Sequence, residues 1–235
     1  MFLSERMRQS PRPAVWRWLG LIAFVPLAFV AATRAEPIEA RIGPFLGSLY
    51  EAICVLLVIG GLALRAGLAG CHPLEREELD ASGFYSMTRN PVYLANSLVL
   101  VGIMLFTQDV LLAVASALWL AVYYERTILA EEARLFRRFG MVFVGWATLT
   151  PVFLPRLAGW RPPAAPFSLR AMLRREPLIW LAATTALATI AFLSDHHESG
   201  PTDDLGLLVL FAAAIVGAGI SLIGRQAGFL DDPHP

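Results

Sequence analysis

The sequence predicts an all-α, polytopic membrane protein with about six transmembrane helices. Three observations predict this class. Of the 235 residues, 57% are hydrophobic and only 16% are charged, whereas soluble domains carry about 25% charged residues. Six apolar stretches approach the roughly 20 residues that a helix needs to cross a hydrocarbon layer about 30 Å thick. No segment alternates strand and helix in the manner of a nucleotide-binding sheet.

The six apolar stretches are residues 16–33, 44–64, 91–106, 110–124, 177–193 and 205–224. The third and fourth are short and only three residues separate them, so they predict a central helical hairpin. The first stretch follows a basic leader, and a cleaved signal peptide is the alternative for it. We expect a span there, because Arg34 beside the small residues is a poor cleavage context.

The basic residues predict the orientation and exclude one class of partner. All 19 are arginines, and 19 acidic residues balance them. Cytoplasmic flanks of membrane helices collect positive charge. If both termini are cytoplasmic, every arginine except Arg34 and Arg41 lies on the inner side. The neutral balance argues against a nucleic-acid partner, which requires a basic surplus.

A first polar cluster, residues 79–93, precedes the third apolar stretch. Asn90 as N-cap and Pro91 as first helical residue would make it an ordinary helix start. Capping does not explain why Arg89 and two tyrosines gather at the same membrane boundary. The cluster is therefore a candidate site.

A second polar cluster, residues 123–140, follows the hairpin and has a helical pattern. On a helical wheel, Glu132 projects among apolar residues and Glu131 lies at the edge of that stripe. A carboxylate on an apolar face beside a membrane is costly without a cationic partner. Function is one interpretation of these acids, and a simple pair of Glu131 with Arg134 or Arg138 is the other.

Two further segments carry polar residues without a predicted chemistry. Residues 145–155 contain two prolines that exclude a regular helix, and we expect this segment to wrap over a site. The adjacent His196 and His197 are expected in a solvated loop. No spacing matches a zinc site, so no metal is predicted.

Together, the first two clusters resemble a known superfamily. The pattern G-x-Y-x-x-x-R-[HN]-P-x-Y occurs as GFYSMTRNPVY at residues 83–93, and E-E-x-x-L-x-x-x-F-G occurs as EEARLFRRFG at residues 131–140. In this order around a hairpin, they resemble the isoprenylcysteine carboxyl methyltransferase and phospholipid methyltransferase superfamily. The longer run through residues 123–176 looks most like the bacterial branch that methylates the 1-phosphate of lipid A.

The resemblance implies S-adenosylmethionine as cofactor, bound by a cytoplasmic segment of the protein, and a lipid that enters from the bilayer. The family motif favours Glu131 for the cofactor's ammonium group, while the helical wheel places Glu132 further inward, and both are kept. The implied cofactor-binding residues are Leu79, Tyr85, Asn90, Pro91, Tyr93, Glu131 and Glu132.

The acceptor implied by the narrower match is an anionic headgroup oxygen such as a lipid phosphate. Such an oxygen needs no general base, but it does need an arginine to hold it. Arg126 is the first candidate for this catalytic role and Arg89 the second. The alternatives are a prenylated cysteine carboxylate or a phospholipid amine as acceptor, or a non-catalytic membrane protein such as a small transporter.

The predicted organisation is one membrane domain over residues 1–235. It comprises a methyltransferase core at residues 77–157, a cytoplasmic linker at residues 158–176 and a C-terminal two-helix extension at residues 177–235. The resemblance implies an integral protein of the bacterial inner membrane, with the bilayer and a membrane lipid as its partners.

Overall fold

The computed structural model describes residues 13–34, 38–71 and 78–199. Its helices are α2 (Pro13–Ala32), α3 (Ile38–Ile42), α4 (Pro44–Cys71), α5 (Pro91–Phe106), α6 (Val110–Phe139), α7 (Met141–Leu149), α8 (Leu169–Arg175) and α9 (Pro177–Ser199). Two short 3-10 helices, η1 (Phe84–Ser86) and η2 (Leu157–Gly159), lie in the connections.

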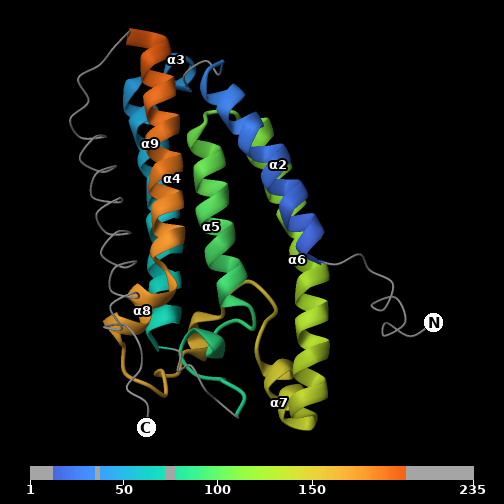
Figure 1. The fold of residues 1–235 in the computed structure, drawn as a ribbon. Helices are drawn as coiled ribbons and strands as arrows, with labels where there is room; N and C mark the ends of the chain where they lie inside the picture. The colour runs from blue at the N-terminus through green and yellow to red at the C-terminus, as the bar shows by residue number, and fades with distance from the viewer. Residues whose placement is uncertain (1–12, 35–37, 72–77, 200–235) are drawn as a thin grey trace.

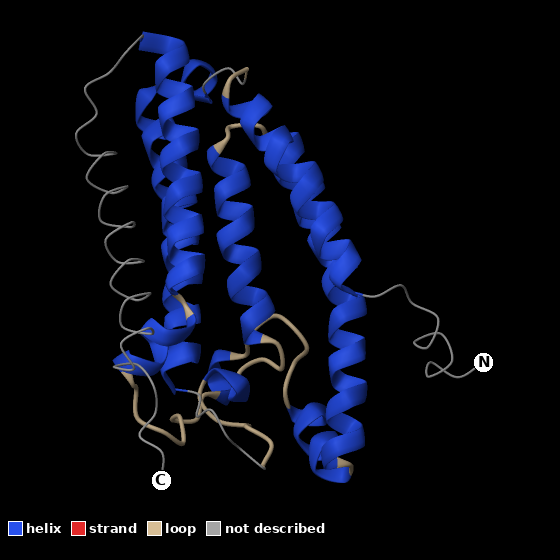
Figure 2. Cartoon of the chain, viewed as in Figure 1, coloured by secondary structure: helices blue, strands red, loops and turns tan. Residues whose placement is uncertain are grey.

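The long helices form an elongated bundle (Figure 1). Helix α2 runs along α6, and α7 and α8 lie at the same end of the bundle as η1, which we call the site end. The described part of the chain contains no strand (Figure 2), and its one β-type contact is an isolated bridge between Gly83 and Arg161. The all-α prediction is confirmed.

The prediction of six spans is confirmed only in part. Among the described residues, three helices are long and apolar enough to cross a membrane: α4, α6 and residues Pro177–Ser194 of α9. Shorter apolar helices cover Ala23–Ala32 and Pro91–Phe106. The sixth predicted span, residues 205–224, lies outside the described residues. The loop expected at His196 and His197 is wrong, because α9 continues to Ser199.

Helix α4 presents two different faces, as a helix between protein and lipid should. Leu56 is 64% exposed and Phe45 79% exposed on one face, whereas Cys54 and Val58 are buried on the other. A row of exposed apolar side chains on a water-facing helix would be a liability, but it suits contact with lipid chains. The faces therefore agree with a membrane position for this helix.

Glycines permit close packing between α4 and α5. A Cβ on Gly102 would lie 2.9 Å from the Cys54 carbonyl oxygen, and one on Gly61 would lie 2.7 Å from the Ala95 carbonyl oxygen. Small residues at such crossings let backbones approach, which is the usual way in which membrane helices associate. Helix α5 consequently packs more extensively on α4 than on its hairpin partner α6.

The predicted hairpin is present, but its second helix is longer than expected. A short turn joins α5 to α6, and the Asp109 carboxylate caps α6 by accepting from the Leu112 backbone N–H at 3.0 Å. Helix α6 continues past residue 124, where the predicted apolar stretch ends, and reaches Phe139. Its apolar part and its charged last turns therefore form one continuous helix. Gly140, at φ 54°, ends the helix and reverses the chain into α7.

Candidate functional site

The site end is assembled from two loops that hydrogen-bond to each other. The loop before α5 is joined by backbone hydrogen bonds to the segment that follows α7. The Arg89 backbone N–H donates to the Pro151 carbonyl at 2.8 Å, and the Arg156 N–H donates to the Met87 carbonyl at 3.0 Å. Further along, the Gly83 N–H donates to the Arg161 carbonyl at 3.0 Å. Segments more than 60 residues apart are thus held together by backbone bonds.

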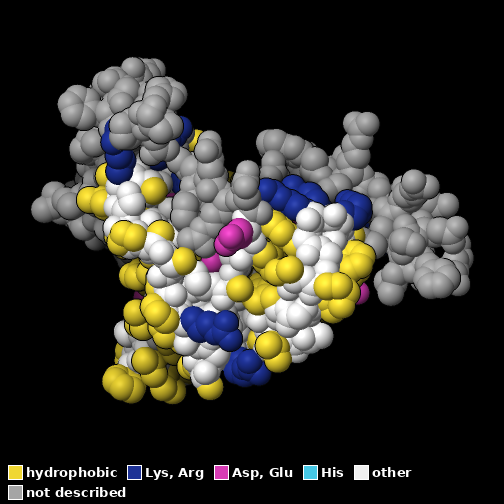
Figure 3. Space-filling view, turned by 90° about the horizontal axis from the view of Figure 1, so that it is seen from below, with side chains coloured by type: hydrophobic (Ala, Val, Ile, Leu, Met, Phe, Trp, Pro, Cys, Tyr) yellow, Lys and Arg dark blue, Asp and Glu magenta, His cyan; other side chains and the backbone are white. Residues whose placement is uncertain are grey.

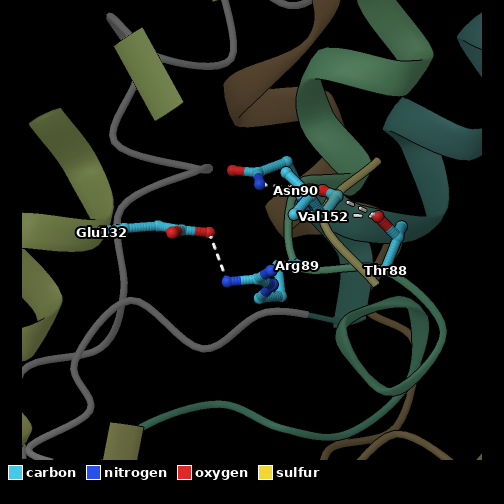
Figure 4. Close-up of polar contacts among 5 residues, drawn as sticks. All are labelled: Thr88, Arg89, Asn90, Glu132 and Val152. Carbon is cyan, nitrogen blue, oxygen red and sulfur yellow. Dashed lines mark hydrogen bonds and ion pairs between the residues drawn. The ribbon is translucent and has the colours of Figure 1, made fainter. Parts of the chain in front are cut away.

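Two buried side chains strengthen this contact (Figure 4). The Thr88 hydroxyl donates to the Val152 and Phe153 carbonyls, and the Asn90 amide nitrogen donates to the Val152 carbonyl at 2.9 Å. Asn90 stands at the N-cap position before Pro91, but its side chain makes no capping bond. The predicted helix start is therefore confirmed in position, while the Asn90 side chain donates to the covering segment and does not cap the helix. The wrap expected of residues 145–155 is observed for residues 150–155, whereas residues 145–149 belong to helix α7.

Beside these loops lies a cavity of about 450 Å³, within the usual size range for small-molecule sites. All seven residues that the sequence assigns to the cofactor line it, and so does Arg89. The other lining residues are Glu78, Asp80, Val92, Leu135, Arg138, Phe139 and Trp146. Figure 3 looks at this end of the molecule and shows acidic side chains near its middle, with arginines around them.

The two neighbouring glutamates of α6 are held in different ways. One Glu132 oxygen accepts from the Arg89 guanidinium at 2.7 Å, and the two side chains are only 22% and 16% exposed (Figure 4). Glu131 is 36% exposed; one of its oxygens accepts from Arg134 at 2.6 Å, and the other accepts from the Tyr93 hydroxyl at 3.3 Å. The pair of Glu131 with Arg134 is confirmed, and because Glu131 also lines the cavity its functional role stays a prediction.

Burial shifts the pKa values of two titratable groups that line the cavity and lie outside the apolar part of the bundle. It raises the pKa of the Glu132 carboxyl, and the Arg89 guanidinium opposes that rise. Burial raises the pKa of Tyr85 to about 12, with smaller contributions from Asp80 and Glu131. Tyr85 is therefore a neutral phenol near neutral pH, and the charge of Glu132 depends on its arginine partner.

The structure separates the two predicted catalytic arginines. Arg89 lines the cavity, and its buried Nε has no hydrogen-bond partner within the described residues. Arg126 is exposed and is not among the residues that line the cavity. The geometry therefore favours Arg89 over Arg126 as the group that meets a ligand.

Sequence reasoning missed several lining residues. Trp146 was not among the predicted site residues, but it lines the cavity and its indole N–H donates to the Tyr85 carbonyl at 3.2 Å. Glu78 and Asp80 were not chosen, although they adjoin the predicted Leu79. Their shared position in one loop was the available signal. Among the described residues, no group of three or more His, Cys, Asp or Glu side chains could hold a metal ion.

Comparison with known proteins agrees with the geometry. Residues 52–141 match the model of the phospholipid methyltransferase family. This segment is similar to the phospholipid methyltransferases. It contains both sequence motifs and most of the residues that line the cavity. The match supports the superfamily to which the motifs pointed.

Two curated bacterial proteins are also similar. A nickel-cobalt-cadmium resistance protein of Alcaligenes xylosoxydans xylosoxydans is 32% identical over 127 residues, which are 53% of this chain and 59% of that protein. A cobalt-zinc-cadmium resistance protein of Cupriavidus metallidurans is 35% identical over 150 residues, or 64% and 66% of the two chains. The chain thus matches less than two thirds of the length of either relative. No solved structure matches the chain.

Proposed function

We propose that this protein is an S-adenosylmethionine-dependent methyltransferase that modifies a membrane lipid, at an anionic headgroup oxygen such as a phosphate. The observation that carries the proposal is the acidic, tyrosine-lined cavity at the end of an apolar helical bundle. The family match over residues 52–141 supports the reaction class. The family match does not identify the acceptor of the methyl group.

The residues that line the cavity fit the cofactor. Four carboxylates and two arginines surround it, together with four aromatic side chains. S-adenosylmethionine carries a sulfonium and an ammonium group, which favour carboxylates and the faces of aromatic rings. When bound, it supplies an activated methyl group. Glu131 is the residue we assign to the ammonium group, because its carboxylate is braced by Arg134 and Tyr93.

The chain's own residues position the reactants and need not move a proton. A phosphate oxygen is already anionic near neutral pH, so its methylation requires alignment and no general base. Arg89 is the residue we assign to that oxygen, since its unpartnered Nε–H is a buried donor beside the cavity. Glu132 holds the same guanidinium in place from α6.

The names of the two relatives are compatible with this proposal. Both names describe resistance to divalent metals. Phosphate and carboxylate oxygens at a membrane surface attract divalent cations. Methylation of such an oxygen would remove a negative charge from the lipid and lower that attraction. We therefore extend a role in metal tolerance to this protein as part of the proposal.

Calorimetry tests the cofactor assignment. The full-length protein in detergent should bind S-adenosylmethionine, and Glu131→Gln should weaken binding about 10-fold to 100-fold, the range expected for one charge-assisted hydrogen bond. Glu125→Gln is the matched control, because Glu125 is exposed on the same helix and does not line the cavity. Equal losses in both variants, or no binding by folded wild type, would overturn the proposal.

An amine acceptor is the second candidate, and the excess of carboxylates around the cavity favours it. Mass spectrometry of lipids from cells with and without the protein separates the two. A gain of one methylene mass on a lipid with a free phosphate supports the first candidate. The same gain on an aminolipid supports the second.

A further inference from the structure

A second, smaller cavity adjoins the first. Its volume is about 160 Å³, and Arg65, Arg175 and Glu176 line it. Tyr85 and Val92 line both cavities, so these two side chains form the wall between them. A group in the smaller cavity would therefore lie next to a ligand in the larger one.

A buried ion pair fixes one side of the smaller cavity. The Arg65 guanidinium donates to both Glu176 oxygens, at 2.7 Å and 2.9 Å, and also to the Asn96 side-chain oxygen. The Arg65 and Glu176 side chains are only 11% and 8% exposed. Such a two-bond contact holds both groups in a single geometry. It ties α4 and α5 to the junction between α8 and α9.

Arg175 is the second arginine that lines this cavity. Two arginines face one carboxylate here, whereas four carboxylates face two arginines in the larger cavity. Arg175 donates to the Ala69 carbonyl at 3.2 Å, which anchors its side chain at the end of α4. The two adjoining cavities thus have opposite charge balances, one suited to a cation and the other to an anion.

The position of the smaller cavity suits a lipid headgroup. Arg175 and Glu176 directly precede Pro177–Ser194, one of the three helices long and apolar enough to cross a membrane. A phosphate at the surface of a bilayer lies at this level, with its acyl chains alongside the apolar helices. Both residues lie outside the segment that matches the family model.

We propose that the smaller cavity binds the phosphate-bearing headgroup of the acceptor lipid and that Arg175 determines this specificity. The inference rests on the proposed function and adds to it the place of the acceptor. Tyr85 and Val92 border both cavities, so a headgroup held by Arg175 extends past them and presents its acceptor oxygen to Arg89 in the larger cavity.

The test is titration of dioctanoyl phosphatidic acid into the full-length protein in detergent, followed by native mass spectrometry. Arg175→Gln should weaken lipid binding about tenfold and leave S-adenosylmethionine affinity within twofold of wild type. Arg170→Gln makes the same charge change at an exposed position of α8 that does not line the cavity, and it should change neither affinity.

Two further ligands identify what is bound. Dioctanoylglycerol, which lacks the phosphate, should bind weakly to wild type, and inorganic phosphate should bind more weakly than the lipid. Inorganic phosphate binding as tightly as phosphatidic acid would overturn the assignment to a lipid. If Arg175→Gln does not fold, Leu68→Phe adds bulk to the cavity wall without changing charge and should weaken lipid binding in the same way.

The outcomes distinguish the two proposals. Unchanged phosphatidic acid binding in folded Arg175→Gln, with intact binding of S-adenosylmethionine, overturns this inference and leaves the proposed function standing. Binding of phosphatidic acid that depends on Arg175, in a wild type that binds no S-adenosylmethionine, supports the headgroup site and overturns the proposed function.

Discussion

The side chains of Arg89 and Glu132 should be energetically coupled in the folded protein. The burial of this ion pair determines the size of the coupling energy. The two atoms in contact lie 2.7 Å apart, and the side chains are 16% and 22% exposed. Exposed pairs contribute about 0.2–1 kcal/mol, whereas loss of one partner from a fully buried pair costs about 3–5 kcal/mol. For this largely buried pair we expect Arg89→Gln and Glu132→Gln each to lower the free energy of unfolding by about 2 kcal/mol.

A double-mutant cycle measures the coupling. The double variant should lose about 2.5 kcal/mol rather than the sum of the two single losses, because neither charge is left without its partner, which gives a coupling near 1.5 kcal/mol. The assay is reversible unfolding in mixed micelles, followed by circular dichroism. The Glu131 and Arg134 pair is the control: it is more exposed and lies within one helix, so its coupling should stay below about 0.5 kcal/mol. Equal coupling energies for the two pairs would refute this reasoning.

Three substitutions test the packing around the site, each by the change in unfolding free energy in the same micelles. Asn90→Ala removes the bond to the covering segment and should cost about 1 kcal/mol, while a loss within error would mean that the bond does not hold the wrap. Gly102→Val should cost about 1–3 kcal/mol, because its Cβ would meet the α4 backbone, and an unchanged value would contradict the close crossing. Gly140→Ala should cost about 1 kcal/mol because of its φ of 54°, although nothing lies within 4 Å of the added Cβ. Gly145→Ala is its control, since that site is helical and equally open, and a similar loss there would refute the backbone explanation.

Local patterns in the sequence predict most of the candidate site. The motif around Arg89 and the helical wheel of α6 place acids and tyrosines at one boundary, and the structure brings these residues around one cavity. Both signals are short-range, since a helix fixes which residues share a face. The long-range contacts could not be predicted in this way.

The pair between Arg65 and Glu176 illustrates what was missed. Arg65 and Glu176 are 111 residues apart, and the sequence around either residue does not predict the other as its partner. The hydrogen bond of the Asn90 side chain could not be predicted for a similar reason, because the acceptor it bonds belongs to a segment more than 60 residues away. Long-range pairs depend on how the helices pack, which hydropathy and spacing do not encode.

Methyl transfer itself provides the most direct test of the central claim. Full-length protein in liposomes made from bacterial lipid extract would receive S-adenosylmethionine labelled in its methyl group. The account predicts label in the organic-solvent-extractable lipid, retained with Glu125→Gln and reduced at least tenfold with Glu131→Gln. Folded protein that binds S-adenosylmethionine but leaves all of the label in the aqueous phase would contradict the account.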